Sequence, residues 1–320
     1  MMNALLLIVG IALLAIGGEG LIRGALAIAN RLQISPLLSG LLIVGFGTSA
    51  PELVVSIDAV THGQPDIAIG NVVGSNIGNI LLILGLCALI TPLYVKPQIL
   101  QRDASVVVAT SILFLALTYD GMIGVLDASI LLIVFVAYLI WAYRSESTSN
   151  APSAELHKAE SEEVSKLPRS LFAIILFVVG GLCLLILGSQ VLLKGAVGLA
   201  EYFSVPEAVV GLTIVAVGTS LPELSISVMA ALRKHADVAI GNVLGSNIFN
   251  LLGILGVSAL LHPLSLASRI SQFDQWVMLA VSVLLLLFLY TGKRLNRIEG
   301  GILLLGYIVY VMLSLTIFVV

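Results

Sequence analysis

The chain has 320 residues, of which 59% are hydrophobic and only 10% are charged. Soluble globular domains carry about 25% charged residues, so this composition excludes that class and is typical of a protein that crosses a membrane several times. Cys87 and Cys183 lie apart in apolar segments and indicate neither a disulfide framework nor a zinc site.

Apolar segments long enough to cross a bilayer recur along the whole chain. They predict an all-α polytopic membrane protein with ten transmembrane helices. The first segment has no positive charge before it, so we expect a helix there and not a cleaved signal peptide. The expected limits are residues 3–29, 37–60, 67–91, 104–118, 123–142, 170–200, 208–231, 238–261, 275–290 and 298–319.

The first expected span contains Glu19 and Arg23, which are four residues apart and are expected to form an ion pair. The second span contains the sequence GTSAPEL at residues 47–53. Pro51 has no backbone N–H, so the carbonyl of Gly47 loses its helical partner and the helix is expected to break. A broken helix at bilayer depth is tolerated only where its free groups face protein or a polar cavity.

The residues around this break are rich in oxygen. Thr48, Ser49 and Glu52 supply hydroxyls and a carboxylate within one turn. A carboxylate in a membrane helix is costly to bury, so it indicates a functional site.

The third expected span contains GNVVGSNIGN at residues 70–79. Ser75 and Asn79 are four residues apart and share one helix face. Asn76 lies on another face, where we expect it to bond to backbone or to a neighbouring helix. Asp103 and its counterpart Asp274 each precede an expected span, and we expect them to cap helices.

Between the fifth and sixth spans lies a hydrophilic stretch rich in Ser, Glu and Lys, at residues 144–169. We interpret it as a linker, which divides the chain into a first half (residues 1–143) and a second half (residues 170–320). If the linker is cytoplasmic, Lys194 and Arg269 alone among the Lys and Arg residues fall on the outer side. The positive-inside rule therefore predicts a cytoplasmic linker with both termini outside.

The second half repeats the first with an offset of 171 residues. Residues 218–224 read GTSLPEL and residues 241–250 read GNVLGSNIFN, and 27 of the 47 positions in 40–86 and 211–257 are identical. Since each half has five expected spans, the second half enters the membrane from the opposite side, as two inverted five-helix repeats. The repeated residues are Thr219, Ser220, Glu223, Ser246 and Asn250.

These repeated oxygens predict a cation site shared by the second, third, seventh and eighth spans. Hard cations such as Ca²⁺ take 6–8 oxygen ligands and need negative charge nearby. Soft and imidazole ligands are absent from the two motifs, which argues against zinc or copper. A lone Ser or Asn in a membrane helix is often only a helix–helix hydrogen bond, but the doubling of the whole set favours a site.

Other classes of protein were weighed against a secondary transporter. The inverted repeats argue against a passive cation channel. An intramembrane enzyme is disfavoured because the chain has no nucleophile–base pair and no HExxH motif. We expect no cofactor, no nucleic acid and no obligate protein partner. The expected partners are the transported ions and the lipid bilayer, and the expected location is the plasma (inner) membrane.

GTSxPE followed by GNxxGSN, present twice, resembles the α-repeats of the cation/calcium antiporter superfamily, and in particular the prokaryotic sodium/calcium exchangers that include the YrbG-like bacterial proteins. The resemblance implies exchange of Ca²⁺ for Na⁺ by alternating access. It also implies that the first and sixth helices slide across a core of four helices. Glu52 and Glu223 would ligate Ca²⁺ and share in Na⁺ binding.

The resemblance implies roles for the remaining motif residues as well. Thr48 and Thr219 would join the calcium site through their backbone carbonyls, and Asn79 and Asn250 would line its centre. The residues implied in sodium binding are Ser49, Ser75, Ser220 and Ser246, together with carbonyls near Gly45 and Ala216.

Some exchangers of this superfamily have aspartate at the position of Asn250, whereas this chain has asparagine in both repeats. The site then holds two formal negative charges, which neutralise one Ca²⁺ but leave three Na⁺ under-compensated. Two close carboxylates also repel each other without a cation, which favours proton uptake. Ca²⁺/H⁺ exchange and K⁺-dependent exchange therefore stay open as alternatives.

Overall fold

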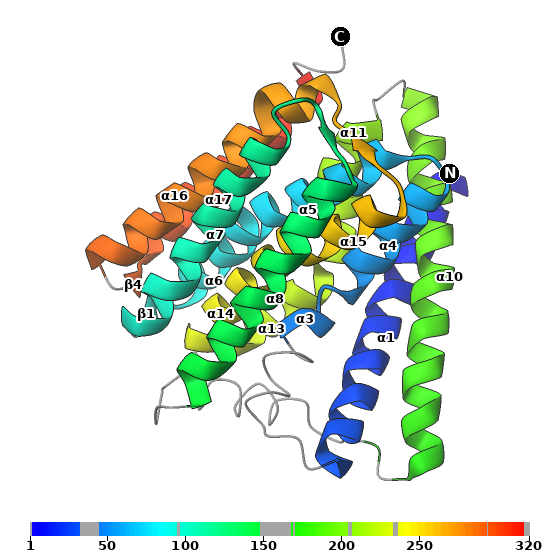
Figure 1. The fold of residues 1–320 in the computed structure, drawn as a ribbon, viewed down its shortest axis with the longest axis horizontal. Helices are drawn as coiled ribbons and strands as arrows, with labels where there is room; N and C mark the ends of the chain where they lie inside the picture. Colours follow the sequence, from blue (N-terminus) through cyan, green and yellow to red (C-terminus); the bar gives the residue numbers. More distant parts are fainter. Residues whose placement is uncertain are drawn as a thin grey trace.

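The chain folds into a bundle of helices that cross one another at varied angles (Figure 1). The computed structural model describes residues 2–32, 45–94, 97–147, 168, 170–203, 207–232, 236–292 and 294–316. The first half contains α1 (Met2–Arg31), α3 (Gly45–Gly47), α4 (Ala50–Thr61), α5 (Pro65–Gly78), the π-helix η2 (Asn79–Leu84), α6 (Gly85–Ile90), α7 (Pro97–Leu117) and α8 (Val125–Ser147). Most of the expected linker, beyond Ser147, lies outside the described residues.

The second half follows a similar order. Its elements are α10 (Leu171–Phe203), α11 (Glu207–Val210), η3 (Gly211–Val215), α12 (Ala216–Thr219), α13 (Leu221–Leu232), α14 (Ala236–Ile248), η4 (Phe249–Ile254), α15 (Leu255–Leu261), η5 (Ile270–Asp274), α16 (Gln275–Gly292) and α17 (Arg297–Thr316). The π-helices η3 and η5 have no counterpart among the described residues of the first half. Two short antiparallel strand pairs join the halves: β1 (Leu93–Tyr94) with β4 (Arg294–Leu295), and β2 (Met122–Ile123) with β3 (Leu264–Ser265).

The protein is a helical membrane protein. Among the described residues, seven helices are long and apolar enough to cross a bilayer, and an eighth span is formed if the bent pair 211–219 and 221–232 is counted as one. The expected spans 37–60 and 104–118 are not in that set, and residues 37–44 of the former lie outside the described part of the chain.

The expected helix breaks occur at the same place in both halves. Ser49 lies between α3 and α4 with φ −86° and ψ 11°, and Ser220 lies between α12 and α13 with φ −80° and ψ 12°. The second break bends the helix by 52°. Each serine precedes a proline by two residues, and the missing proline N–H accounts for the interruption.

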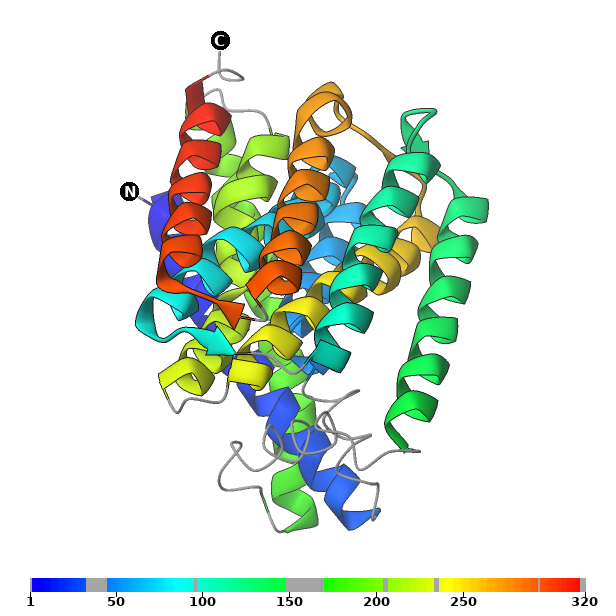
Figure 2. The ribbon, with the colours of Figure 1, turned by 90° about the vertical axis from the view of Figure 1, so that its left-hand side faces the viewer.

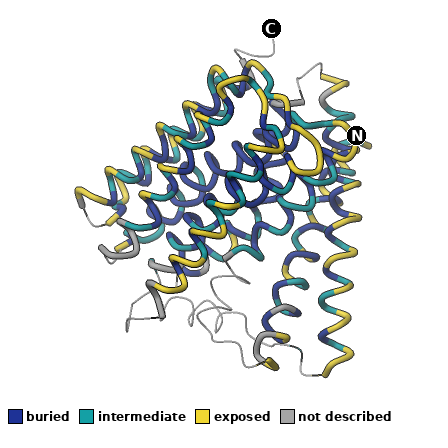
Figure 3. The backbone as a smooth tube through the Cα atoms, in the orientation of Figure 1, coloured by how far each residue is buried: buried dark blue, intermediate teal, exposed yellow. Residues whose placement is uncertain are grey.

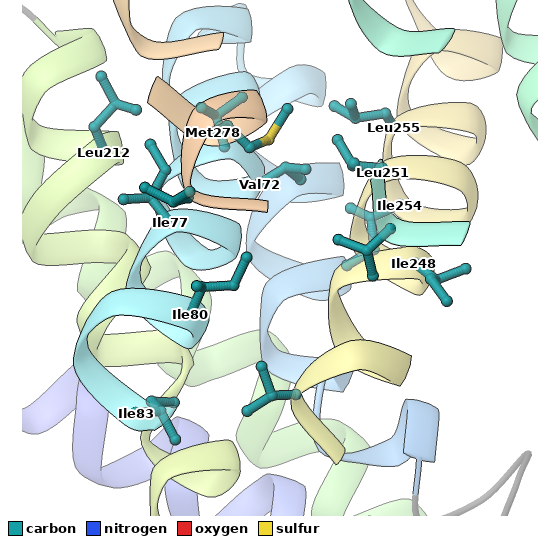
Figure 4. Close-up of a cluster of buried hydrophobic side chains, with 14 of the residues drawn as sticks. Val72, Ile77, Ile80, Ile83, Leu212, Ile248, Leu251, Ile254, Leu255 and Met278 are labelled. Carbon is teal, nitrogen blue, oxygen red and sulfur yellow. The ribbon is translucent and has the colours of Figure 1, made fainter. Parts of the chain in front are cut away.

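The central helices are the α5–α6 and α14–α15 segments. In each of them 78% of the apolar window is buried, against 33% or less in α1, α8, α10 and α17. Figure 3 shows this as a buried centre surrounded by helices with exposed outer faces. Apolar side chains of α5 and η2 face those of η4 and α15, and Met278 of α16 lies beside Val72 (Figure 4).

Two long helices, α1 and α10, run side by side along one edge of the bundle (Figure 1, Figure 2). Their glycines recur every seven residues, and a Cβ on several of these would lie within 3 Å of the opposite backbone. A Cβ on Gly10 would be 2.6 Å from the nitrogen of Leu192, and one on Gly181 would be 2.6 Å from the nitrogen of Leu21. The helices are therefore antiparallel and in backbone contact, which only glycine permits here.

Several charged side chains within the helices are paired. Arg23 and Glu19 form the expected ion pair at 2.6 Å. The capping role expected for Asp103 and Asp274 is wrong, because Asp103 lies inside α7 and Asp274 at the junction of η5 and α16. Asp103 accepts hydrogen bonds from Arg102 and Tyr138. Asp274 is bonded in the same way by residues Arg269 and Tyr310.

Candidate functional site

Glu52 and Glu223 follow the two helix breaks, and each is completely buried. Ser49 Oγ donates a hydrogen bond of 2.7 Å to Glu223 Oε1, and Ser220 Oγ donates one of 2.8 Å to Glu52 Oε1. Each carboxylate is thus held by the serine of the other repeat. The crossed bonds bring the two breaks together, and the two carboxylates interact electrostatically.

Ser75 and Ser246 come from the central helices and join the same cluster. Ser246 Oγ donates to Glu223 Oε1 at 3.4 Å, and Ser75 Oγ lies 3.1 Å from Ser220 Oγ. Ser75 Oγ in turn donates to the carbonyl of Ala216 at 3.4 Å. Both serines are therefore next to a carboxylate or to the serine that holds one.

Thr48 and Thr219 lie at the ends of the interrupted helices and use their hydroxyls for contacts to asparagines. Thr219 Oγ1 donates to Asn71 Oδ1 at 3.0 Å, and Thr48 Oγ1 donates to Asn242 Oδ1 at 3.4 Å. Thr48 is also 3.4 Å from Ser246 Oγ. A hydroxyl that donates its hydrogen keeps its oxygen lone pairs, so each threonine can offer both its hydroxyl oxygen and its backbone carbonyl to a cation.

Asn71 and Asn242 were missed as site residues by the sequence analysis. Asn71 Nδ2 donates to the carbonyl of Glu52 at 3.3 Å, and Asn242 Nδ2 donates to the carbonyl of Glu223 at 3.3 Å. Each also bonds a serine one turn beyond the glutamate, at 3.1 Å. Their signal was the GN pair that opens both copies of the second motif, but the spacing alone did not show which face of the helix they occupy.

Asn79 and Asn250 form a second group with Asn76 and Asn247. Asn79 Nδ2 donates to Asn247 Oδ1 at 2.9 Å, and Asn250 Nδ2 donates to Asn76 Oδ1 at 3.1 Å. The expectation that Asn76 bonds to backbone is confirmed, since its Nδ2 donates to the carbonyl of Asn247 at 3.2 Å. No hydrogen bond joins the side chains of Asn79 and Asn250 to those of the two glutamates.

Unpartnered oxygens concentrate in these two groups. Among the described residues, five buried side-chain oxygens or hydroxyls have no hydrogen-bond partner: Glu52 Oε2, Glu223 Oε2, Asn79 Oδ1, Asn250 Oδ1 and Ser258 Oγ. The first four are two pairs at matched positions of the repeat. Since buried polar atoms are nearly always bonded, a matched set of free oxygens indicates a cation site.

The donor set is made of oxygen alone. No group of three or more His, Cys, Asp or Glu residues suited to a metal ion occurs in the described part of the chain. Two carboxylates with neutral hydroxyl, amide and carbonyl oxygens match hard cations such as Ca²⁺ and Na⁺ better than transition metals. They also match an ion that must leave again, because fewer charged ligands hold it less tightly.

Two hollows adjoin the cluster or the helices around it. A small one of about 10 Å³ is bordered by Ser75, Ser220 and Ala216, and has room for one water-sized particle. A larger cavity of about 540 Å³ lies between α1, α4 and α10, where Asp58 and His62 line it. Ser189 Oγ of α10 donates to Asp58 at 2.5 Å.

The family model described as sodium/calcium exchanger protein matches residues 2–144 and 173–316. The chain belongs to the sodium/calcium exchanger protein family. The match covers both repeats and leaves out little more than the hydrophilic stretch between them.

Relatives from bacteria and archaea match along nearly their whole length. The inner membrane protein YrbG of Escherichia coli is 35% identical over 311 residues, covering 95% of this chain and 94% of YrbG. The sodium/calcium exchanger MaX1 of Methanosarcina acetivorans is 32% identical over 343 residues, covering 96% of this chain and 97% of MaX1. The structure of the sodium–calcium exchanger NCX_Mj, soaked with Na⁺ and Ca²⁺, is 31% identical with a TM-score of 0.67 and covers 98% of both chains.

Membership of this exchanger family decides the coarse function. The chain is a multi-pass membrane protein and a cation/calcium antiporter, and its relatives are transporters and not enzymes. The exchanger family uses no cofactor, and Na⁺ and Ca²⁺ are its transported substrates.

Proposed function

We propose that this chain exchanges Ca²⁺ for Na⁺ by alternating access, with the ions competing for a site between Glu52 and Glu223. The observation that carries the proposal is the matched set of free oxygens on Glu52, Glu223, Asn79 and Asn250. Two carboxylates neutralise one Ca²⁺, whereas two buried charges without a cation would repel each other and cross the bilayer unfavourably. The empty carrier is therefore expected to resist the conformational change, which couples the two ion fluxes.

Within this site we assign the oxygens by type. Glu52 and Glu223 bind Ca²⁺ directly, together with the backbone carbonyls of Thr48 and Thr219. Asn79 and Asn250 line the centre of the site with their free oxygens. The serines are assigned to sodium binding: Ser49, Ser75, Ser220 and Ser246.

Sodium is favoured over the proton as counter-ion by the small hollow beside Ser75, Ser220 and the carbonyl of Ala216. A proton needs only a carboxylate, whereas Na⁺ needs several oxygens around a space of its own. The hollow offers hydroxyl and carbonyl oxygens next to a carboxylate-bound serine. The relatives MaX1 and NCX_Mj, which carry sodium/calcium exchange in their names, support the same choice.

The architecture that we propose has ten spans in two inverted repeats, residues 1–143 and 170–320, joined by a cytoplasmic linker at 144–169. The crossed bonds between the two halves support a two-fold relation, because the serine–glutamate and asparagine–carbonyl contacts of one repeat each have a counterpart in the other. The charge bias of the sequence places both termini outside. Placement in the inner membrane rests on the similarity to YrbG.

We infer further that α1 and α10 move together against the central helices. Their backbone contact makes the pair one rigid unit, and its contact with the breaks is apolar: a Cβ on Gly18 would lie 3.4 Å from the ring of Pro51 and 3.9 Å from that of Pro222. The cavity lined by Asp58 would then be the outer entrance.

Ion flux into liposomes tests the counter-ion. The full-length protein is reconstituted and loaded with Na⁺, and uptake of radiolabelled Ca²⁺ is measured with an outward Na⁺ gradient and, separately, with a pH gradient in the absence of Na⁺. We expect uptake only with the Na⁺ gradient. Uptake driven by the pH gradient alone, with Na⁺ inert, would reject sodium coupling in favour of proton coupling, and single-channel currents would indicate a channel.

A further inference from the structure

Asn76 and Asn247 form a reciprocal pair across the two halves of the molecule. Asn76 Nδ2 donates to the backbone carbonyl of Asn247 at 3.2 Å, and Asn247 Nδ2 donates to the carbonyl of Asn76, also at 3.2 Å. Both side chains are buried, with 1% and 0% exposure. Neither residue is among the ligands proposed above, yet each touches one of them.

The carbonyl contact determines which way each amide points. A backbone carbonyl only accepts, so the carboxamide of Asn76 must turn its NH₂ group toward it. Its oxygen then lies on the opposite side, where it accepts the bond from Asn250 Nδ2 at 3.1 Å. That bond occupies the NH₂ group of Asn250 and turns Asn250 Oδ1 away, to a place where it is buried and unpartnered.

The same chain of contacts runs in the other half. Asn247 Nδ2 donates to the carbonyl of Asn76, and Asn247 Oδ1 accepts from Asn79 Nδ2 at 2.9 Å. Asn79 Oδ1 is left buried and unpartnered. The same arrangement occurs in both halves, which argues against an accidental orientation of either amide.

The two carbonyls that accept these amides lie close to the π-helical turns. The π-helix η2 begins at Asn79, and η4 begins at Phe249, just after Asn76 and Asn247 respectively. A carbonyl oxygen has two lone pairs, so the carbonyl of Asn76, which accepts the backbone N–H of Asn79, can also accept the amide of Asn247 from the opposite helix.

We propose that Asn76 and Asn247 are positioning residues that orient the amides of Asn250 and Asn79, so that oxygen and not NH₂ faces the transported cation. This inference rests on the proposed function, because the proposed cation site is what makes the unpartnered amide oxygens ligands. A reversed amide would present a partial positive charge to the ion. Partners that orient metal ligands typically contribute roughly 10- to 100-fold to affinity.

A double-mutant cycle separates positioning from packing. Asn76→Leu removes the group that orients Asn250, and Asn250→Asp replaces the amide by a carboxylate that offers oxygen at both ends. Equilibrium binding of radiolabelled Ca²⁺ to the purified full chain, without Na⁺, is measured for both single variants and the double variant. We expect Asn76→Leu to weaken Ca²⁺ affinity by about 10-fold or more in the native background.

In the Asn250→Asp background we expect Asn76→Leu to lower affinity by less than about 2-fold, within the usual error of additivity. An equal loss in both backgrounds would overturn the inference, because a packing residue would act independently of the chemistry at position 250. Unchanged affinity in the single variant would also overturn it. If Asn76→Leu does not fold, the mirrored cycle of Asn247→Leu and Asn79→Asp decides by the same criteria.

Two controls keep this result separate from the proposed function. Ser111→Ala removes a buried hydroxyl of α7 that donates to the carbonyl of Val107 in the same helix. This variant should leave Ca²⁺ affinity unchanged. Glu52→Gln should abolish binding. If Glu52→Gln retains full affinity, the proposed site itself fails, whereas loss in Glu52→Gln with native affinity in Asn76→Leu refutes only the positioning role.

Discussion

The side chains that meet at the centre differ in kind from those that join α1 to α10. At the centre, buried serines and asparagines of one half bond to glutamates and carbonyls of the other, and the threonines bond to asparagine side chains of the other half. Between α1 and α10, glycines bring the backbones into direct contact, with leucine and valine side chains around them. The first region depends on directional bonds between specific atoms and the second on the absence of side chains.

We infer from this difference that the centre is the rigid part of the molecule and that the α1–α10 pair is the part that moves. Directional bonds within the centre hold ligand oxygens in place, which ion selectivity requires. The α1–α10 pair meets the helix breaks through the apolar rings of Pro51 and Pro222, a contact that can slide without breaking hydrogen bonds, while the bond from Ser189 of α10 to Asp58 of α4 would have to break. A transporter can therefore change access by moving the pair and keep its ligands together.

The largest effect should come from removing one of the two charges. Glu52→Gln or Glu223→Gln keeps the shape of the side chain but leaves a divalent cation with one carboxylate. At an effective dielectric of about 20 a charge contact is worth roughly 3 kcal/mol or more, so Ca²⁺ exchange should fall on the order of 100-fold. Liposome flux measures the loss, and size-exclusion chromatography checks that each variant is folded.

Glu19→Gln is the matched control for these variants. Glu19 is exposed and pairs with Arg23 on α1, so its neutralisation should leave exchange unchanged. Substantial Ca²⁺ exchange by either purified Glu52→Gln or Glu223→Gln would contradict the assignment of the site.

A smaller loss is expected from the crossed serines. Ser49→Ala or Ser220→Ala removes one hydrogen bond to a carboxylate, of 2.7 or 2.8 Å. Hydrogen bonds to charged groups contribute about 1.5–3 kcal/mol, so Ca²⁺ affinity should fall by at least about 10-fold. Ser282→Ala is the control, because that buried hydroxyl donates to the carbonyl of Met278 at 2.7 Å and lies 3.5 Å from Ser111 Oγ, and neither contact is with a carboxylate. Equal affinities in the site variants and the control would show that the crossed bonds do not organise the carboxylates.

The contact between α1 and α10 is tested by measuring the stability of the protein instead of ion binding. A Cβ on Gly181 would lie 2.6 Å from backbone of α1, so Gly181→Ala should force the helices apart and lower the free energy of unfolding by about 1–3 kcal/mol. Gly180→Ala is the control, since a Cβ there meets nothing within 4 Å and alanine is the better helix former. Thermal unfolding in detergent compares them. Equal melting temperatures would refute close packing of this pair.

The doubled motifs anticipated much of the central arrangement. The helix breaks follow from the missing N–H of Pro51 and Pro222, a property of the residue itself that no tertiary contact can alter. The meeting of the two motifs followed from their repetition. The assignment of the ten motif residues as ligands remains a prediction, for which the unpartnered oxygens are support.

Other features depended on partners far away in the chain. Asp103 and Asp274 were expected to be caps because each precedes an expected span, and the sequence did not show that Tyr138 and Tyr310, on other helices, donate to them. No local residue pattern in the sequence predicts the π-helical turns. The seven-residue spacing of glycines in α1 and α10 was readable from the sequence, but its meaning depends on the two helices being neighbours.

The smallest effect should come from Asp58, at the edge of both regions. Its carboxylate accepts a hydrogen bond from Ser189 of α10 and lies 3.1 Å from His62 Nδ1, beside the large cavity. Asp58→Asn keeps the contact with Ser189 but removes a negative charge from the proposed entrance, so Ca²⁺ uptake at low salt should slow by about 2-fold. Screening should erase the difference at high ionic strength, where the Debye length falls to about 3 Å. Ser189→Ala loses the contact and keeps the charge, so it separates the two roles. If Ca²⁺ uptake by Ser189→Ala changes at every salt concentration, while uptake by Asp58→Asn does not change, Asp58 ties α4 to α10 and does not attract cations.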